Sequence, residues 1–152
     1  MAKFRYKLQT VLDVAEHKER SVRMDLVRAQ AAESEARQRL DATLQMGTHW
    51  EERVRDLQHG RLDARQLHDM LRGLDSMRQR AAREREALRA AERAVEAVRV
   101  RLTEAAQSRK MLERLKERAG DEYNAQALSL QIKATDEIAS VRSAAMMSGA
   151  HS

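Results

Sequence analysis

The sequence predicts an all-α protein, an elongated antiparallel two-helix coiled-coil hairpin whose second helix overhangs the first. The chain has 152 residues and no proline, so no residue obliges a helix to break. Aromatic residues make up only 3% of it, too few for an ordinary globular core. Two long stretches carry apolar residues at alternating steps of four and three, which is the spacing of a coiled coil.

The stronger apolar stripe lies between Met70 and Tyr123, where thirteen of sixteen such positions are apolar. A stripe this narrow is buried only against another helix, so the second half of the chain requires a helical partner. We call its members the second seam: Met70, Leu74, Met77, Ala81, Glu84, Leu88, Ala91, Val95, Val98, Leu102, Ala105, Arg109, Leu112, Lys116, Ala119 and Tyr123.

A weaker stripe in the first half supplies this partner, with eleven apolar residues in fifteen positions. It predicts a first helix over about residues 8–59. We call its members the first seam: Leu8, Leu12, Ala15, Glu19, Val22, Leu26, Ala29, Glu33, Ala36, Leu40, Thr43, Gly47, Trp50, Val54 and Leu57.

Stop and start signals separate the two stripes. Gly60 suits the left-handed conformation that often follows a helix end. Asp63 and Gln66 have the spacing of a capping box, and Leu62 and Leu67 that of a hydrophobic staple. The turn is therefore expected at about residues 60–63, and such a short turn makes the helices antiparallel.

The whole chain, residues 1–152, is expected to form a single coiled-coil domain. The second helix is expected over about residues 64–142, and a flexible tail over 143–152. An antiparallel register about this turn pairs residues whose numbers add to about 124. It places Trp50 opposite Leu74, and Glu84 against Leu40, a mismatch that snorkelling would relieve. A shift of one heptad satisfies the pattern equally well.

This register leaves the residues beyond about Asn124 without a partner in the first helix. Apolar residues nevertheless continue there: Ala127, Leu128, Leu130, Ile132, Ala134, Ile138 and Val141. An exposed apolar stripe of this kind marks a surface for a protein partner. A frayed helical tail and pairing with a second copy of the chain are the alternatives.

The sequence offers no catalytic, metal or cofactor site. Cysteine is absent, which excludes disulfides and thiolate ligands. No two histidines stand four residues apart, and no Gly-rich phosphate loop is present. No apolar run is long enough to cross a membrane. We therefore expect a cytoplasmic protein that is not an enzyme, binds no cofactor or metal and does not insert into the membrane.

The charge pattern argues against nucleic-acid binding. The net charge is +5, from 29 basic and 24 acidic residues. Arginines from Arg78 to Arg101 alternate with glutamates, as on a solvated coiled-coil flank, rather than forming a basic face with aromatics. A tighter basic cluster runs from Arg109 to Arg118. It is either ordinary helix surface or a charge that steers an acidic partner.

Short motifs near both ends resemble one family. The opening Phe4-x-Tyr6-x-Leu8-Gln9-x-Val11-Leu12-Asp13 is similar to the start of FliJ, a coiled-coil component of the bacterial flagellar type III export apparatus. The later segments 109–118, Glu122-Tyr123 and 136–139 are similar to the C-terminal half of that family. The resemblance covers nearly the whole chain. Gly120, inside the second helix, departs from the pattern and is expected to weaken or bend the helix.

The resemblance implies a stalk-like coiled coil that binds the hexameric export ATPase and promotes its assembly and activity. It also implies contacts with the export-gate membrane protein and with export chaperones, at the inner-membrane export apparatus. Carried onto this chain, the ATPase-binding residues are Phe4, Tyr6, Leu8, Leu112, Leu115, Tyr123, Leu130 and Ile138. The export-gate contacts are Trp50, Met70 and Leu74, near the turn.

Three alternatives stay open at this point. One is the equivalent stalk of a virulence type III secretion system, and the second is a structural homodimer that pairs its overhanging helices. The third is a coiled coil that binds nucleic acid. Around Trp50, local packing is the alternative to a partner contact.

Overall fold

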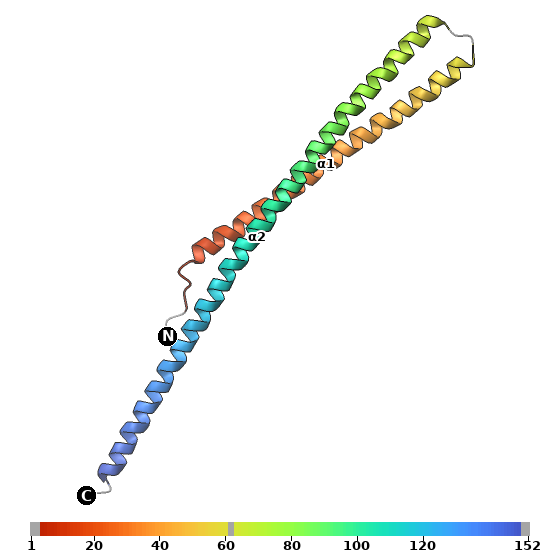
Figure 1. Ribbon diagram of the computed structural model, residues 1–152. Coiled ribbons are helices and arrows are strands. Elements are labelled where there is room, and N and C mark those ends of the chain that lie inside the picture. The colour runs from red at the N-terminus through yellow and green to blue at the C-terminus, as the bar shows by residue number, and fades with distance from the viewer. Residues whose placement is uncertain (1–3, 61–62, 150–152) are drawn as a thin grey trace. The chain divides into compact units, whose positions relative to one another are not determined.

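The computed structural model describes residues 4–60 and 63–149, and these residues form two helices (Figure 1). Helix α1 spans Gln9–Gln58 and helix α2 spans Ala64–Gly149. The described residues contain no strand. The expected all-α hairpin of two long helices is therefore confirmed.

Contacts between residues divide the chain into two compact units. Unit 1 comprises Met1–His17 and Ala106–Ser152, and unit 2 comprises Lys18–Ala105. Each unit contains part of both helices, and each is described by itself below. The expected single domain stays a prediction.

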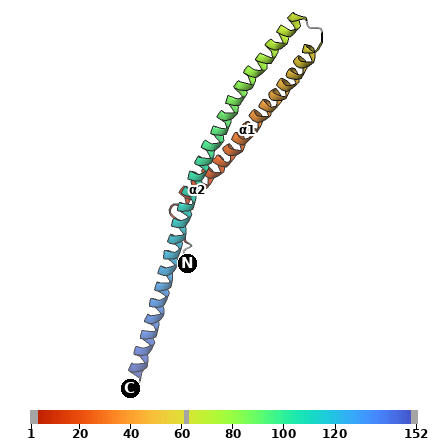
Figure 2. The ribbon, with the colours of Figure 1, turned by 45° about the vertical axis from the view of Figure 1, so that its right-hand side comes forward.

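In unit 2 the two seams cover each other. Helix α1, drawn orange to yellow, runs alongside the green part of α2 in both views (Figures 1 and 2). The apolar residues that are buried in this unit all belong to the two seams: Val22, Ala36, Leu40, Val54, Leu74, Ala81, Val95 and Ala105. Residues between the seam positions are mostly exposed. The heptad spacing therefore identified the side of each helix that packs.

Ion pairs between the helices flank this core. Arg37 approaches Glu92 at 3.6 Å, and Arg101 approaches Asp25 at 3.3 Å. Such exposed pairs each contribute at most about 1 kcal/mol. Because they join α1 to α2 on the outside of the seams, they favour antiparallel pairing in one register more than they add to stability.

The turn differs from expectation at Gly60. The backbone N–H of His59 donates to the Asp56 carbonyl, and that of Gly60 to the Leu57 carbonyl, both at 3.3 Å. These bonds reach back three residues and tighten the last turn, so its carbonyls are satisfied without a left-handed residue. Gly60 has no positive φ, and the left-handed expectation is wrong. Leu62 lies outside the described residues.

The expected start of α2 is found at Asp63. Its Oδ1 accepts a hydrogen bond at 3.1 Å from the backbone N–H of Arg65, two residues on. This is the bond of an N-cap residue, which satisfies one of the free donors of the first helical turn.

In unit 1, helix α2 extends further than expected. The helix continues to Gly149, past the expected end near residue 142, so the segment 143–149 is helix and not a flexible tail. The run Ala144-Ala145-Met146-Met147 explains the difference, because Ala and Met favour helix. Gly120 also lies within the helix without ending it.

Candidate functional site

The overhanging part of α2 in unit 1 exposes its apolar side chains. Every described residue from Asp121 to Gly149 is exposed. Leu130 is 67% exposed and Ile138 is 56% exposed. Within unit 1, the ribbon of residues 4–17 does not run beside the blue part of the helix in either view (Figures 1 and 2). The prediction that residues beyond Asn124 have no partner in the hairpin is confirmed for this unit, and we call residues 124–149 the overhang.

Apolar side chains occupy more than one face of the overhang. At 3.6 residues per turn, Leu130 continues the line of the second seam, and Ile138 lies about 80° around the helix from it. Leu128 and Ile132 fall near the opposite side of the helix, and they are 58% and 54% exposed. A helix that is apolar on opposed faces is typically covered from more than one side. The site prediction named Leu130 and Ile138 but neither Leu128 nor Ile132, whose spacing indicated the opposite face.

The first residues of the chain pack on α2 just before the overhang. The ring of Phe4 lies 5.4 Å from the ring of Tyr123, with an angle of 45° between the two planes. Gly120 lies beneath this ring, where a Cβ would stand 3.8 Å from Phe4 Cε1, an ordinary van der Waals contact. The structure therefore brings Phe4 and Tyr123 together as one aromatic contact. The sequence did not reveal that Gly120 lies under this contact, where a methyl group would also fit.

The remaining residues expected to bind the ATPase differ in accessibility. Tyr6 and Leu112 are half-buried, whereas Leu8 is 43% exposed. The Tyr6 hydroxyl is buried and has no hydrogen-bond partner among the described residues. Leu115 lies on another face of α2, because Leu112 occupies the seam while Leu115 lines a hollow that includes Met111.

Near the turn, in unit 2, Trp50 packs against a glycine. A Cβ added to Gly73 would lie 3.2 Å from Trp50 Cζ3, closer than ordinary van der Waals contact. Trp50 itself is half-buried, as expected for an indole that two helices cannot enclose. Sequence reasoning placed Leu74 opposite this ring and missed Gly73, the residue before it.

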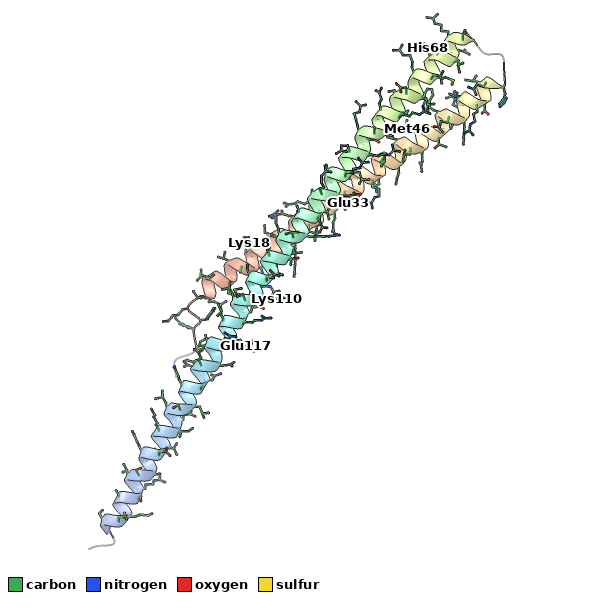
Figure 3. All side chains as sticks on the ribbon, in the orientation of Figure 1. Lys18, Glu33, Met46, His68, Lys110 and Glu117 are labelled. Atoms are coloured by element: carbon green, nitrogen blue, oxygen red, sulfur yellow. The ribbon has the colours of Figure 1, made fainter. Side chains whose placement is uncertain are left out.

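The three residues expected to contact the export gate are not equally available. Trp50 and Met70 are half-buried, but Leu74 is only 7% exposed and packs in the core. Met46, labelled in Figure 3, and Leu71 are more accessible, at 45% and 46%. Leu74 therefore supports this surface from beneath, while Met46, which lines a hollow together with Trp50, extends it.

A hollow of about 310 Å³ lies between the helices in the same unit. Gly47 and Ala81, which are small seam residues, leave this space between α1 and α2. The lining residues are Thr43, Leu44, Gly47, Thr48, Glu51, Leu74, Met77, Arg78, Ala81 and Arg85.

One seam position is polar on both helices. Glu84 was expected to face Leu40 and to snorkel; its Oε1 accepts a hydrogen bond from Arg80, whereas its Oε2 is buried with no hydrogen-bond partner among the described residues. The Thr43 hydroxyl, followed by Arg80, lowers the pKa of Glu84 by more than burial raises it. The Arg80 Nε lies 3.1 Å from Glu84 Oε1. Thr43 is buried in the first seam, as Glu19 is, so Thr43 and Glu84 form one polar layer of a mainly apolar core.

The part of the chain that the structure describes contains no group of three or more His, Cys, Asp or Glu side chains that could hold a metal ion. Within the same residues, neither helix has a segment apolar enough to span a membrane. The features that remain are surfaces suited to proteins: the overhang with its aromatic contact, and the Trp50 end of the hairpin.

Comparison with known proteins identifies a family. The family described as "Flagellar FliJ protein" matches residues 4–148. This range includes both helices almost completely. No curated protein and no solved structure matches the chain.

Proposed function

The chain belongs to the FliJ family of flagellar proteins and is thus a component of the flagellar export apparatus, and from this premise we propose that it is the non-catalytic stalk of the export ATPase. In this proposal the coiled coil binds the hexameric ATPase and promotes its assembly and activity. It also links the ATPase to the export-gate membrane protein and to export chaperones. The chain then works in the cytoplasm, peripherally associated with the inner-membrane export apparatus.

The exposed apolar faces of the overhang carry the proposal. Leu130 continues the seam without a partner helix, Leu128 and Ile132 lie near the opposite side, and Ile138 lies between these two faces. Burying both faces requires a partner that surrounds the helix, and the interior of a ring-shaped hexamer has that form. A flat partner surface would leave one of the two faces in water.

The residues just before the overhang complete the proposed ATPase contact. Phe4, Tyr6, Leu8, Leu112 and Tyr123 belong to unit 1, as does the overhang. The Phe4–Tyr123 contact holds the first described residues of the chain against α2, so that both rings are presented together. Leu115 points to a different face, and we assign it to the surface described in the next subsection.

Truncation after Asn124 tests the ATPase contact. We expect the truncated chain to keep the helical circular dichroism and the melting temperature of its hairpin, because no other helix packs on the deleted residues. Stimulation of the purified export ATPase should be lost. The full-length double variant Leu130→Ser/Ile138→Ser should show the same loss, and Thr135→Ser, on the same exposed helix, is the matched control.

Two results would overturn this assignment. Full stimulation by the truncated chain would show that the overhang is not the ATPase contact. Loss of hairpin folding on truncation would contradict the finding that the overhang has no partner. Light scattering of the full chain over a range of concentrations detects the remaining alternative, pairing of the overhang with a second copy.

The Trp50 end of the hairpin is the proposed contact for the export gate. Trp50, Met70 and Met46 form its surface, over the buried Leu74. Trp50→Ser is expected to impair export in a hairpin stabilised elsewhere, while stimulation of the ATPase persists. Normal export by that variant would leave Trp50 with a packing role alone.

A further inference from the structure

The outward face of α2 in unit 1 carries a surface that helix packing and the proposed ATPase contact leave unused. A hollow of about 450 Å³ runs along this face. Its described lining residues recur at steps of three and four, so they share one side of the helix. We call them the basic strip: Gln107, Lys110, Met111, Arg114, Leu115 and Arg118.

The centre of the basic strip is apolar and open to solvent. Met111 is 64% exposed and Leu115 is 43% exposed. The seam residues of the same segment, such as Leu112 and Ala119, are covered instead. The strip therefore faces away from the first helix, and the hairpin itself does not bury these two side chains.

Three cations border this apolar centre at intervals of four residues. Lys110, labelled in Figure 3, is followed by Arg114 and Arg118. At 1.5 Å per residue, neighbouring cations in the row start about 6 Å apart along the helix. None of the three is in an ion pair with another described residue, whereas Arg109 on the seam side lies 2.8 Å from Glu113.

We propose that the basic strip binds an acidic amphipathic helix of a partner protein. Carboxylates spaced four residues apart on such a helix would face Lys110, Arg114 and Arg118 in turn. Apolar residues beside them would cover Met111 and Leu115, and a methionine side chain adapts readily to the shape of its partner. Opposite charges would speed the encounter and fix the register of the two helices.

The same features disfavour other occupants. The cations span only about 12 Å, and the strip has no aromatic residue on which a nucleic-acid base could stack. Glu117 and Asp121 lie at neighbouring positions on α2, where an anionic membrane would repel them. A second copy would bring two basic strips together, which like charges oppose.

This inference goes beyond the proposed function and does not depend on the ATPase. The strip ends at Arg118, before the overhang begins, so the chain truncated after Asn124 retains it. Failure of ATPase stimulation and failure of helix binding are therefore separate results on the same protein.

A labelled synthetic peptide of about three heptads tests the proposal with the full chain, by fluorescence anisotropy. The peptide carries Glu at every fourth position beside a row of Leu, and a scrambled peptide of equal composition is the first control. We expect Arg114→Glu to weaken binding by about tenfold or more, because attraction becomes repulsion. Met111→Ser/Leu115→Ser should weaken it by about tenfold through loss of the apolar contact.

A matched variant and two competitors complete the design. Arg83→Glu reverses an exposed cation in unit 2 and should leave binding unchanged, and circular dichroism should show all variants equally helical. Equal binding of the scrambled peptide, or unchanged binding by Arg114→Glu, would overturn the proposal. Displacement of the peptide by phosphatidylserine vesicles or by duplex DNA would also overturn it, in favour of that ligand.

Discussion

The paired coil of unit 2 and the overhang of unit 1 are both helix, but they use their apolar residues differently. In unit 2, Val95 belongs to the second seam, which packs against the first, and it is 3% exposed. In the overhang, Leu130 continues the same spacing and is 67% exposed. Helix formation therefore does not depend on the stripe being covered, because local propensity supports it throughout. What the stripe decides is whether a segment stabilises the hairpin or offers a surface to another molecule.

The two segments also differ in how their charges are used. In unit 2, arginines reach glutamates and aspartates on the other helix, as Arg37 does with Glu92. Along the overhang the charged residues are few: Lys133, Asp136, Glu137 and Arg142. A surface with few charges loses less hydration on burial, so the overhang is the part of α2 better suited to enclosure by a partner.

The largest expected effect comes from placing the same charge in each segment. Val95→Asp should destabilise the hairpin by about 3 kcal/mol or more, because an unpaired carboxylate enters the core. Leu130→Asp should change the free energy of unfolding by less than about 0.5 kcal/mol, since the site is already in water. Urea unfolding followed by circular dichroism measures both. Similar losses for the two variants would remove the distinction between the segments.

The next largest effect on stability is expected at the contact between Trp50 and Gly73 in the paired coil. Trp50→Ala should cost about 1–3 kcal/mol, less than a full core deletion because the ring is only half-buried. The change in the free energy of unfolding caused by Gly73→Ala should be about 1 kcal/mol more favourable in the Trp50→Ala variant than in the wild type. In that variant the indole ring is absent, so the new methyl group meets no clash. Additive effects in the double-mutant cycle would show that Trp50 and Gly73 do not couple.

The polar layer at Glu84 makes a smaller, pH-dependent contribution. Its pKa is lowered in the folded protein, so its ionised form stabilises the fold at a pH above the ordinary carboxyl pKa. This stability is lost as the pH falls through the lowered pKa. Glu84→Gln should therefore be less stable than wild type at neutral pH, by up to about 1 kcal/mol, and the gap should close in acid. Thermal melts at both pH values test this, and a gap that widens in acid would contradict it.

The smallest effect is expected in unit 1, at the Tyr6 hydroxyl. This group is buried without a hydrogen-bond partner among the described residues, which is unfavourable in the isolated protein. Tyr6→Phe should therefore leave stability unchanged or raise it by up to about 1 kcal/mol. A clear loss of stability in a thermal melt would show that the hydroxyl is satisfied in solution.

The sequence determined which side of each helix packs and where packing ends. The seam positions from Leu12 to Leu57 and from Met70 to Ala119 are covered, and exposure begins at Asp121, close to the expected Asn124. These features follow from local spacing, since a seven-residue repeat defines one face of a helix whatever lies opposite. The position of Asp63 at the start of α2 was predicted for the same reason, because an N-cap residue acts through a local hydrogen bond.

Only the tertiary structure decided what each seam residue meets. Gly73 under Trp50, Gly120 under Phe4 and Thr43 beside Glu84 each join residues that are distant along the chain. Such pairs depend on the rotation and relative sliding of two helices, which many contacts set together and no short motif encodes. The sequence therefore predicted the hairpin and its overhang, while the contacts within each layer emerged only from the packed helices.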